Sequence, residues 1–520
     1  AALLNRHFVP VKLDRELHPA LDAYLIGFVE RTAGQAGWPL NVFLSPEGYP
    51  MLGLTYAPPE HFSSLLGRVS RAWERQPAKL AELARRAAAE RAAEGRATRR
   101  DAEGATALAE RLKAQALAFG DDLAGGFGNQ SRFPMAPKLE ALLSLQARAP
   151  DPELGAFLAT TLDAMLRLGL RDHLGGGFFR YTVDPDWRTP HFEKMLYDQA
   201  LLAPLYLRAA QVLERPAYRA VARETLDFMV RELRGEGGGF LSSLSALDGA
   251  GVEGGYYLWR AEELDRLLTP DQKGLLALVW QLEGPPRHEA GLLPVSGVDL
   301  ATAARRLGMR PADAERQLTE ARERLAAARA GRTLPRDDKQ LAGWNGLALS
   351  ALAAGVRAFG EEAYRQAGSA LRDYLVERLW DGQRLQRAVS DEGPIGEAGL
   401  EDYAFVARGL KDWGLATGSQ QDLALAERLV GIAWERYHVD GGWRLADSAL
   451  LPGIPLEPAL PDGPLPSPAA VLMRLSLEGD DQRHRDLARE ALPLSAGAVS
   501  ESPFPFADHA ALLIDPPGDR

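Results

Sequence analysis

Residues 173–178 read His173-Leu-Gly-Gly-Gly-Phe178, and similar glycine–aromatic turns recur along most of the chain. The others are Gly125-Gly-Phe127, Gly238-Gly-Phe240, Gly254-Gly-Tyr256 and Gly441-Gly-Trp443. Long stretches with apolar residues at three- to four-residue spacing separate several of these turns, which indicates amphipathic helices. Helices in recurring pairs indicate a repeat architecture. Because the spacing is too irregular and the loops are too long for a regular solenoid, we predict a closed ring of helical hairpins, an (α/α)6 toroid.

The helical patterns after about residue 119 fall into pairs, and strand patterns nearly vanish there. The expected pairs are 138–149 with 153–171, 191–214 with 217–234, 341–359 with 361–380, 399–416 with 420–437, and 467–478 with 480–494. Segments 103–118 and 505–514 would supply one more pair across the chain ends. We therefore predict a mainly α protein with the barrel in residues 119–520 and a helical linker in residues 81–118.

Residues 1–80 follow a different order, which is strand, helix, strand, strand and helix. Strands are expected at 8–13, 40–45 and 49–54, with a type I turn at Ser45-Pro-Glu-Gly48. This order matches the second half of a thioredoxin fold, and Trp38-Pro39 lies where that fold carries a cis proline. The chain begins at Ala1 in what reads as the middle of a helix, so we interpret it as a fragment without the usual redox-cysteine region.

Composition narrows the possible functions. Of 520 residues, 46% are apolar and 25% charged, an ordinary globular balance, and the net charge is −11. This balance excludes intrinsic disorder as the main state and argues against nucleic acid as a partner, so we interpret the basic run 96–101 as a solvated linker. With no cysteine, the chain has no disulfide or thiolate chemistry of its own. Apolar stretches are too short to span a membrane.

Cofactor motifs are missing from the sequence. The nine histidines show no metal-binding spacing, and no phosphate-binding glycine loop follows a strand. We therefore predict neither a metal nor another cofactor, and we expect a small-molecule partner and a cytoplasmic location.

The segment from His173 to Asp198 holds the densest mixture of polar and aromatic residues. Thr189 is expected to cap a helix whose first residue is Pro190. The cluster offers an acid, a base and positive charge within a few residues, whereas the plainer alternative is a helix start with solvated charges. We select as catalytic candidates His191, Glu193 and Asp198, and as substrate-binding candidates His173, Arg180, Trp187 and Lys194.

Two further helix starts carry polar residues. Near the expected helix 341–359 we select Asp338 as catalytic and Lys339, Trp344 and Asn345 as substrate-binding, because aromatic planes and amides suit a sugar site. At the start of helix 399–416 we select Asp402 as catalytic and Tyr403 as substrate-binding. Simple N-capping by a carboxylate is the alternative for both aspartates. We also select Trp443 as substrate-binding; it belongs to the same kind of rim as Asp462 and Ser467.

These segments together resemble the YyaL-like proteins, the spermatogenesis-associated protein 20 group. The resemblance rests on several long motifs in order: Gly37-Trp-Pro-Leu-Asn-Val-Phe-Leu44, Gly125-Gly-Phe-Gly128, the 173–178 and 190–198 segments, Glu253-Gly-Gly-Tyr-Tyr-Leu-Trp259, Arg336-Asp-Asp-Lys339 with Trp344-Asn-Gly346, and Asp402-Tyr-Ala-Phe405. It implies an N-terminal thioredoxin-like domain joined to a barrel of the six-hairpin glycosidase and N-acylglucosamine 2-epimerase type.

The chain also departs from the family's usual pattern. The family usually has a Cys-His-Trp-Cys-His stretch before the point at which this chain starts, and residues 1–520 do not contain it. Gln130-Ser-Arg-Phe-Pro134 stands where the family usually reads Ala-Pro-Lys-Phe-Pro. Ala246 and Ala469 replace a usual carboxylate and a usual amide at the expected rim. The expected rim therefore lacks one carboxylate and one amide.

Three functions compete. The first is a carbohydrate-active enzyme, either an epimerase or isomerase with histidine bases or a glycoside hydrolase with paired carboxylates. The second is a redox or chaperone-like protein that binds a protein partner through its thioredoxin-like domain. The third is a non-catalytic binding scaffold.

Overall fold

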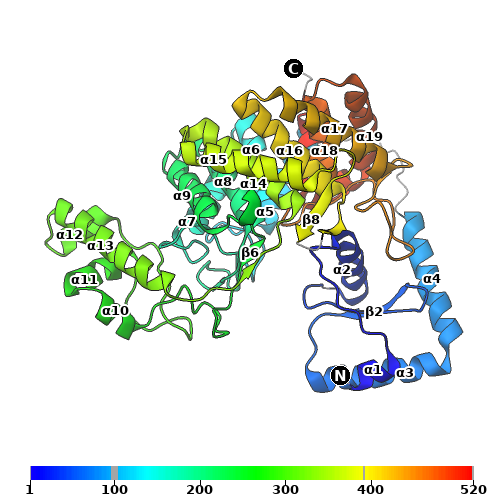
Figure 1. Cartoon of the computed structure of the whole chain (residues 1–520), viewed down its shortest axis with the longest axis horizontal. Coiled ribbons are helices and arrows are strands. Elements are labelled where there is room, and N and C mark those ends of the chain that lie inside the picture. The colour runs from blue at the N-terminus through cyan, green and yellow to red at the C-terminus, as the bar shows by residue number, and fades with distance from the viewer. Residues whose placement is uncertain (1, 35, 95–103, 391–392, 518–520) are drawn as a thin grey trace.

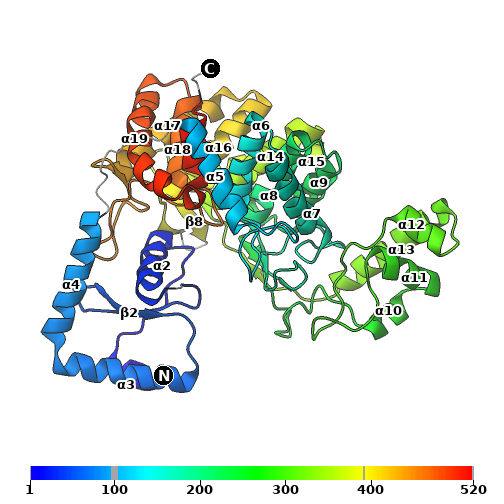
Figure 2. The same cartoon turned by 180° about the vertical axis from the view of Figure 1, so that it is seen from behind.

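The protein is described by a computed structural model that covers residues 2–34, 36–94, 104–390 and 393–517. The described chain is mainly α-helical, with only short strands (Figures 1 and 2). The basic run predicted as a linker, residues 96–101, lies outside the described residues. Among the residues described, no helix combines the length and the hydropathy that crossing a membrane requires.

Six helices form an inner ring. Each packs against the next, and the last packs against the first, so the ring is closed. The inner helices are α6 (Ala136–Arg148), α8 (Leu196–Val212), α14 (Ala342–Phe359), α16 (Leu400–Thr417), α18 (Pro468–Glu478) and α20 (Ala507–Ile514). The closed ring confirms the predicted (α/α)6 toroid.

An outer helix packs against each inner helix. These are α7 (Pro152–Arg167) on α6, α9 (Ala217–Glu232) on α8, α15 (Glu362–Asp373) on α14, α17 (Gln420–Tyr437) on α16, α19 (Gln482–Glu501) on α18, and α5 (Ala105–Phe119) on α20. The sixth pair therefore joins the two ends of the barrel sequence, as the spacing predicted.

Small residues let the inner helices approach closely. A Cβ atom at Gly346 would lie 2.4 Å from the carbonyl oxygen of Phe405, and one at Gly409 would lie 2.4 Å from the carbonyl oxygen of Gly346. Helix α14 is buried along most of its length, as expected of a helix that is apolar all round. The contact between α14 and α16 is thus set by glycine rather than by interlocking large side chains.

The glycine–aromatic turns connect outer helices to inner ones. In two of them an amide side chain from the next inner helix pairs with both backbone groups of the aromatic residue. Gln199 accepts from the Phe178 amide and donates to its carbonyl, both at 2.8 Å. Asn345 does the same with Phe240 at 2.7 and 3.0 Å. These turns therefore dock the outer-helix ends onto the start of the following inner helix.

The predicted start of α8 at Pro190 is wrong. Residues Pro190–His191 form strand β4, which pairs with β3 (Tyr181–Thr182), and Lys194–Met195 form β5. The Thr189 amide donates to the carboxylate of Asp184, so this residue closes a loop instead of capping a helix. The helix begins at Leu196, and His191 and Lys194 lie on separate short strands before it.

A small helical unit interrupts the barrel between β6 (Ser243–Leu244) and β7 (Arg336–Asp337), which form one sheet with β5. Its helices are α10 (Ala261–Leu267), α11 (Pro270–Val279), α12 (Leu300–Arg306) and α13 (Pro311–Ala330). They extend away from the ring in Figure 1. Trp259, Trp280 and Leu325 belong to a separate hydrophobic core in this unit. The predicted pairs did not include these helices.

The N-terminal unit holds α1 (Ala2–His7), α2 (Pro19–Ala33), α3 (Pro59–Arg75) and α4 (Pro77–Glu94) around a hairpin of β1 (Asn41–Leu44) and β2 (Pro50–Leu54). The hairpin, its turn and the cis Trp38-Pro39 bond confirm the predictions. The expected strand at 8–13 does not form: the segment has no regular secondary structure, and Val9 and Val11 are largely exposed. No neighbouring strand among the described residues pairs with it.

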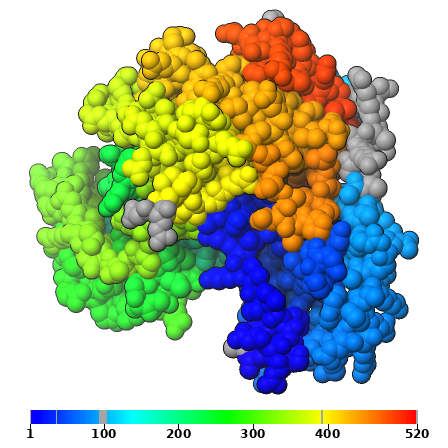
Figure 3. Space-filling view, turned by 45° about the vertical axis from the view of Figure 1, so that its right-hand side comes forward, coloured from blue at the N-terminus to red at the C-terminus, as the bar shows by residue number. Residues whose placement is uncertain are grey.

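The N-terminal unit contacts the barrel on the face shown in Figure 3. The Arg387 side chain, on hairpin β8 (Gln386–Ser390) and β9 (Gly393–Glu397), donates to the carbonyl of Glu16 at 2.5 Å. Arg91 forms an ion pair with Glu457. The remaining short elements are η1 (Glu236–Gly238), η2 (Tyr374–Leu379), η3 (Phe504–Phe506), β10 (His438–Val439) and β11 (Gly442–Trp443).

Candidate functional site

The long loops gather at one end of the barrel. Inner and outer helices follow one another along the chain and run in opposite directions. Every connection from an outer helix to the next inner helix therefore lies at this end. The N-terminal unit and the α10–α13 unit both extend from this side (Figure 1). We call this end the barrel mouth.

Five ionisable side chains lie together near the start of α8, and we name them the mouth cluster: Arg180, His191, Glu193, Asp198 and Glu253. The Arg180 guanidinium donates to the Glu193 carboxylate at 2.7 Å. His191 Nδ1 lies 2.9 Å from the Glu253 carboxylate, and its Nε2 lies 3.8 Å from that of Glu193. The cluster thus places an imidazole between two carboxylates.

Asp198 is the buried member of the mouth cluster. Its side chain is 6% exposed, and its Oδ2 has no hydrogen-bond partner in the described part of the chain. Burial raises the pKa of Asp198 well above its ordinary value, and the Glu193 charge adds to this, while Arg180 opposes it. Since burial disfavours the charged carboxylate, Asp198 is suited to be a proton donor.

Aromatic rings flank the histidine. Tyr181 stacks on the His191 ring with 5.1 Å between centroids, and the partly exposed Phe133 stacks on Tyr181 at 4.6 Å. Sequence reasoning did not select Phe133, Tyr181 or Glu253 as site residues. Tyr181 lies three residues after the 173–178 turn, and Glu253 directly precedes the Gly254-Gly-Tyr256 turn. The position next to a glycine–aromatic turn is therefore the sequence signal that could have identified them.

Lys194 and His173 point away from the mouth cluster. The Lys194 ammonium is buried and donates at 2.8 Å to both the Asp172 carboxylate and the Gly176 carbonyl. Burial lowers the pKa of Lys194 to about 8. His173 Nε2 lies 3.1 Å from the Leu168 carbonyl, and burial lowers its pKa to about 4. Both side chains are therefore hydrogen-bonded to neighbouring loop residues and form no hydrogen bond with a mouth-cluster residue.

The two rim tryptophans are buried. Trp187 donates its indole N–H to the Ala124 carbonyl at 3.0 Å, and a Cβ at Gly126 would lie 2.5 Å from its ring. Trp443 is 1% exposed and packs against Trp434. Both contact neighbouring loops or helices with most of their surface.

Asp402 and Tyr403 hold the start of α16 in place. Asp402 accepts from the Gly343 and Gly399 amides, each at 2.9 Å, and pairs with the buried Arg387 at 2.7 Å. The Tyr403 hydroxyl accepts from the Leu385 amide at 3.0 Å. Asp402 therefore links the starts of α14 and α16 and fixes the position of one helix relative to the other.

The four residues selected near α14 do not form one cluster. Asp338 is exposed, while Lys339 forms ion pairs with Asp14, Glu16 and Asp337. Trp344 contacts the Tyr197 ring edge-on at 4.8 Å and is 5% exposed. Asn345 is fully buried, and its amide is paired with backbone. Lys339 therefore joins the N-terminal unit to the mouth.

A second buried polar group lies elsewhere in the ring. The Asp462 carbonyl accepts from Lys138 at 3.0 Å, and Ser467 caps α18 while its hydroxyl lies 3.1 Å from His509 Nε2. Burial raises the pKa of Asp462 well above its ordinary value. None of these contacts reaches a mouth-cluster residue.

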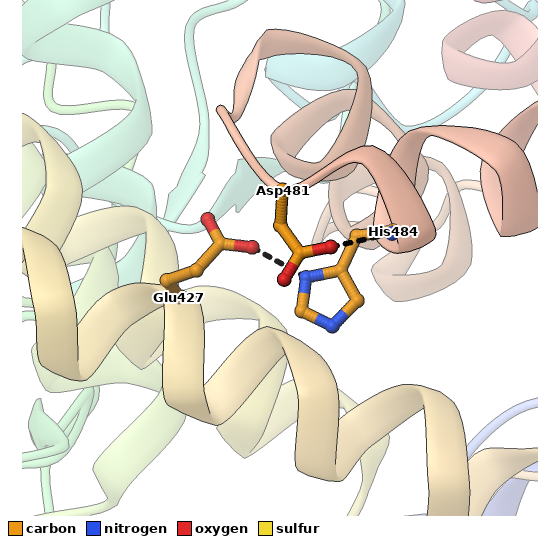
Figure 4. Close-up of side chains that lie close together, drawn as sticks. All are labelled: Glu427, Asp481 and His484. Carbon is orange, nitrogen blue, oxygen red and sulfur yellow. Dashed lines mark hydrogen bonds and ion pairs between the residues drawn. The ribbon is translucent and has the colours of Figure 1, made fainter.

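One described group has the donor types of a metal site: Glu427, Asp481 and His484 (Figure 4). Asp481 caps α19 by accepting from the Arg483 and His484 amides at 2.8 and 3.2 Å. His484 Nδ1 is hydrogen-bonded to Glu427. Helix capping and this histidine–carboxylate pair account for the arrangement without an ion.

The fold defines a class of protein: an (α/α)6 barrel preceded by a thioredoxin-like unit. Residues 1–91 match the family model Thioredox_DsbH, described as a protein of unknown function, DUF255. The chain is similar to spermatogenesis-associated protein 20, as the motifs predicted. It is 31% identical to the human protein over 507 residues, covering 88% of this chain and 64% of the human protein, and equally similar to the rat protein. An uncharacterised Caenorhabditis elegans protein is 27% identical, with 86% and 67% covered.

Solved structures give more distant matches. A D-mannose isomerase matches with a TM-score of 0.48 and 10% identity over 76% of this chain and 86% of that one. A cellobiose 2-epimerase from Bacillus thermoamylovorans matches with a TM-score of 0.47 and 10% identity over 76% and 87%. At these values the likeness does not extend to function.

Proposed function

We propose that the chain is a carbohydrate-active enzyme that transfers protons at the mouth cluster. The observation that carries this proposal is the buried Asp198, whose Oδ2 has no partner among the described residues and which lies close to the Arg180–Glu193 pair; Glu193 in turn lies 3.8 Å from His191. Two titratable groups whose surroundings favour opposite roles are the usual basis of an acid–base pair. Partly exposed Phe133 and the Tyr181 ring offer an apolar face next to it.

The first chemistry is epimerisation or aldose–ketose isomerisation. His191, oriented by Glu253, would take the proton from the carbon next to the sugar carbonyl. Asp198 would give its proton to the carbonyl oxygen, so that an enediol forms without net change of charge on the sugar. Arg180 would stabilise negative charge that develops on oxygen. Return of the protons completes the reaction.

The second chemistry is glycoside hydrolysis, and the pairing of Glu193 with Arg180 favours it. Arg180 donates to the Glu193 carboxylate, and burial raises the pKa of Asp198, so Glu193 would serve as the base or nucleophile and Asp198 as the acid. Retaining enzymes hold the two carboxyl groups ~5–5.5 Å apart and inverting enzymes ~6.5–9.5 Å apart.

Proton NMR of the purified chain with a panel of sugars in deuterated water distinguishes these chemistries. Loss of the C2 proton signal together with a new epimer or ketose supports the first. A new reducing end without exchange supports hydrolysis. His191→Asn and Asp198→Asn should each lower the rate by ~10²–10⁴-fold, whereas Asp338→Asn, an exposed control, should not. Turnover that survives both mouth substitutions would contradict the proposal.

A redox or chaperone-like function is the alternative, and the family match over residues 1–91 supports it. In this case the barrel would bind a protein partner, and the cysteines would lie outside residues 1–520. The coding sequence upstream of Ala1 tests this directly. Absence of a Cys-x-x-Cys motif there would remove the alternative, while silence across the sugar panel with such a motif present would favour it.

A further inference from the structure

A polar pocket lies where the barrel meets the inserted unit, and no mouth-cluster residue lines it. It has a volume of about 560 Å³ and lies between outer helix α9, the 172–176 turn and helix α13 of the inserted unit. Its ionisable lining consists of six cationic and four anionic side chains: Lys194, Arg231, Arg322, Arg329, Arg332 and Arg336, with Asp172, Glu224, Asp227 and Glu232. The lining therefore carries an excess of two positive charges.

The floor of this pocket is a buried ion network. Asp172 accepts from Lys194 at 2.8 Å and from Arg329 at 2.7 Å, and the three side chains are 1–6% exposed. The Lys194 ammonium lies 4.4 Å from the centre of the Phe228 ring and 5.0 Å from that of Tyr257. One carboxylate thus faces two cations, and the floor keeps a net positive charge.

Two buried polar atoms at the floor lack a partner. Tyr257 is 1% exposed, and neither its hydroxyl nor the Nε of Arg329 has a hydrogen bond within the described residues. The charges that act on the Tyr257 hydroxyl are those of Asp172, Arg329 and Glu232, which all line the pocket. Buried polar groups are normally paired, so this hydroxyl and this N–H are groups with which a bound ligand could form hydrogen bonds.

The rim adds free positive charge. Arg322 on α13 and Arg336 on β7 are both exposed and line the pocket. In the part of the chain that the structure covers, neither guanidinium has an ion-pair partner, although Arg322 lies over the Trp280 ring. Arginine is the side chain best suited to bind phosphate or carboxylate through paired N–H groups.

We infer that this pocket binds a small organic anion with a phosphate or carboxylate group. The anionic group would contact Arg322 and Arg336 at the rim, and its polar part would hydrogen-bond to the Tyr257 hydroxyl at the floor. The half-buried ring of Tyr256 lines the pocket between them. Lys194 belongs to this pocket rather than to the mouth. The site is independent of the function proposed for the mouth cluster.

Isothermal titration calorimetry of the whole chain tests the inference, with glucose 6-phosphate, citrate, inorganic phosphate and glucose as probes. Binding of glucose 6-phosphate or citrate, but not of glucose, is expected. The phosphate and carboxylate probes show which anion is preferred. Arg322→Ala and Arg336→Ala should each weaken binding by about tenfold or more, because a hydrogen bond to a charged group typically contributes about that factor.

Two further variants make the result decisive. Arg324→Ala removes an exposed arginine from the same helix that does not line the pocket, so it should leave the affinity unchanged. Tyr257→Phe removes only the unpartnered hydroxyl, so it should weaken binding without lowering the thermal unfolding midpoint of the free protein. Absence of binding by every anionic probe overturns the inference. So does binding that Arg322→Ala, Arg336→Ala and Tyr257→Phe leave unaltered.

Discussion

Replacement of Asp402 by asparagine tests whether this residue serves the fold or the chemistry. Asp402 is fully buried, accepts two backbone N–H groups and pairs with Arg387, which is 1% exposed. An asparagine cannot accept at both side-chain positions, and among the described residues it leaves Glu401 as the one carboxylate paired with Arg387. Breaking a buried ion pair costs about 3–5 kcal/mol, and the remaining Glu401 contact points to the lower end, ~3 kcal/mol.

Thermal unfolding followed by circular dichroism measures this loss. At ~2 °C per kcal/mol, a value at the lower end for large domains, Asp402→Asn should lower the unfolding midpoint by about 6 °C. Asp338→Asn makes the same chemical change at an exposed site and should stay within about 0.5 kcal/mol of the wild type. Any enzymatic activity should fall only as far as the folded fraction does.

The reasoning fails if Asp402→Asn keeps the wild-type midpoint while turnover is lost. That result would return Asp402 to the catalytic role that the sequence suggested. A lowered midpoint with turnover per folded molecule retained would establish the positioning role.

Three further outcomes are expected. For Asp198 the pKa is raised in the folded protein, so the native state holds more protons than the unfolded state above pH ~4, and stability falls as the pH rises through the folded-state pKa. Asp198→Asn has no such titration, so its stability relative to the wild type should increase as the pH rises above ~4 in urea titrations. Gly346→Ala should destabilise the barrel by about 1–3 kcal/mol through overpacking. Gly274→Ala on α11, where a Cβ atom would make only an ordinary contact with Leu307 at 3.7 Å, should leave the barrel equally or more stable, and equal costs for both variants would contradict the close helix contact. Lys339→Ala should increase amide hydrogen exchange in residues 14–17, and high salt should reduce the difference from the wild type, because partly exposed ion pairs are screened.

Much of the fold was predictable because it follows from local patterns. The 3.6-residue spacing of apolar side chains marks each barrel helix, and the pairs predicted from it match the inner and outer rings. The Ser45–Gly48 turn likewise sets the β1–β2 hairpin. Such features depend on residues close in sequence, so one chain is enough to recognise them.

The start of α8 and the 8–13 segment were not predictable in this way. Pro190 suits the first turn of a helix as well as an extended strand, and the loop held by Asp184 decides between them. Residues 8–13 have strand-forming side chains but no partner strand among the described residues. In both places the outcome depends on what lies beside the segment in space.

The candidate site shows the same division. Sequence determined the residue types near each helix start, which were enough to select His191, Glu193 and Asp198. Only the tertiary structure showed that Glu253 contacts His191. It also showed that Lys194 is hydrogen-bonded to Asp172 and not to a mouth-cluster residue. A side chain's role depends on which partners and how much water surround it, and those are set by segments distant in sequence. The amino-acid order therefore determined the ring of helices, and packing decided which polar groups meet at its mouth.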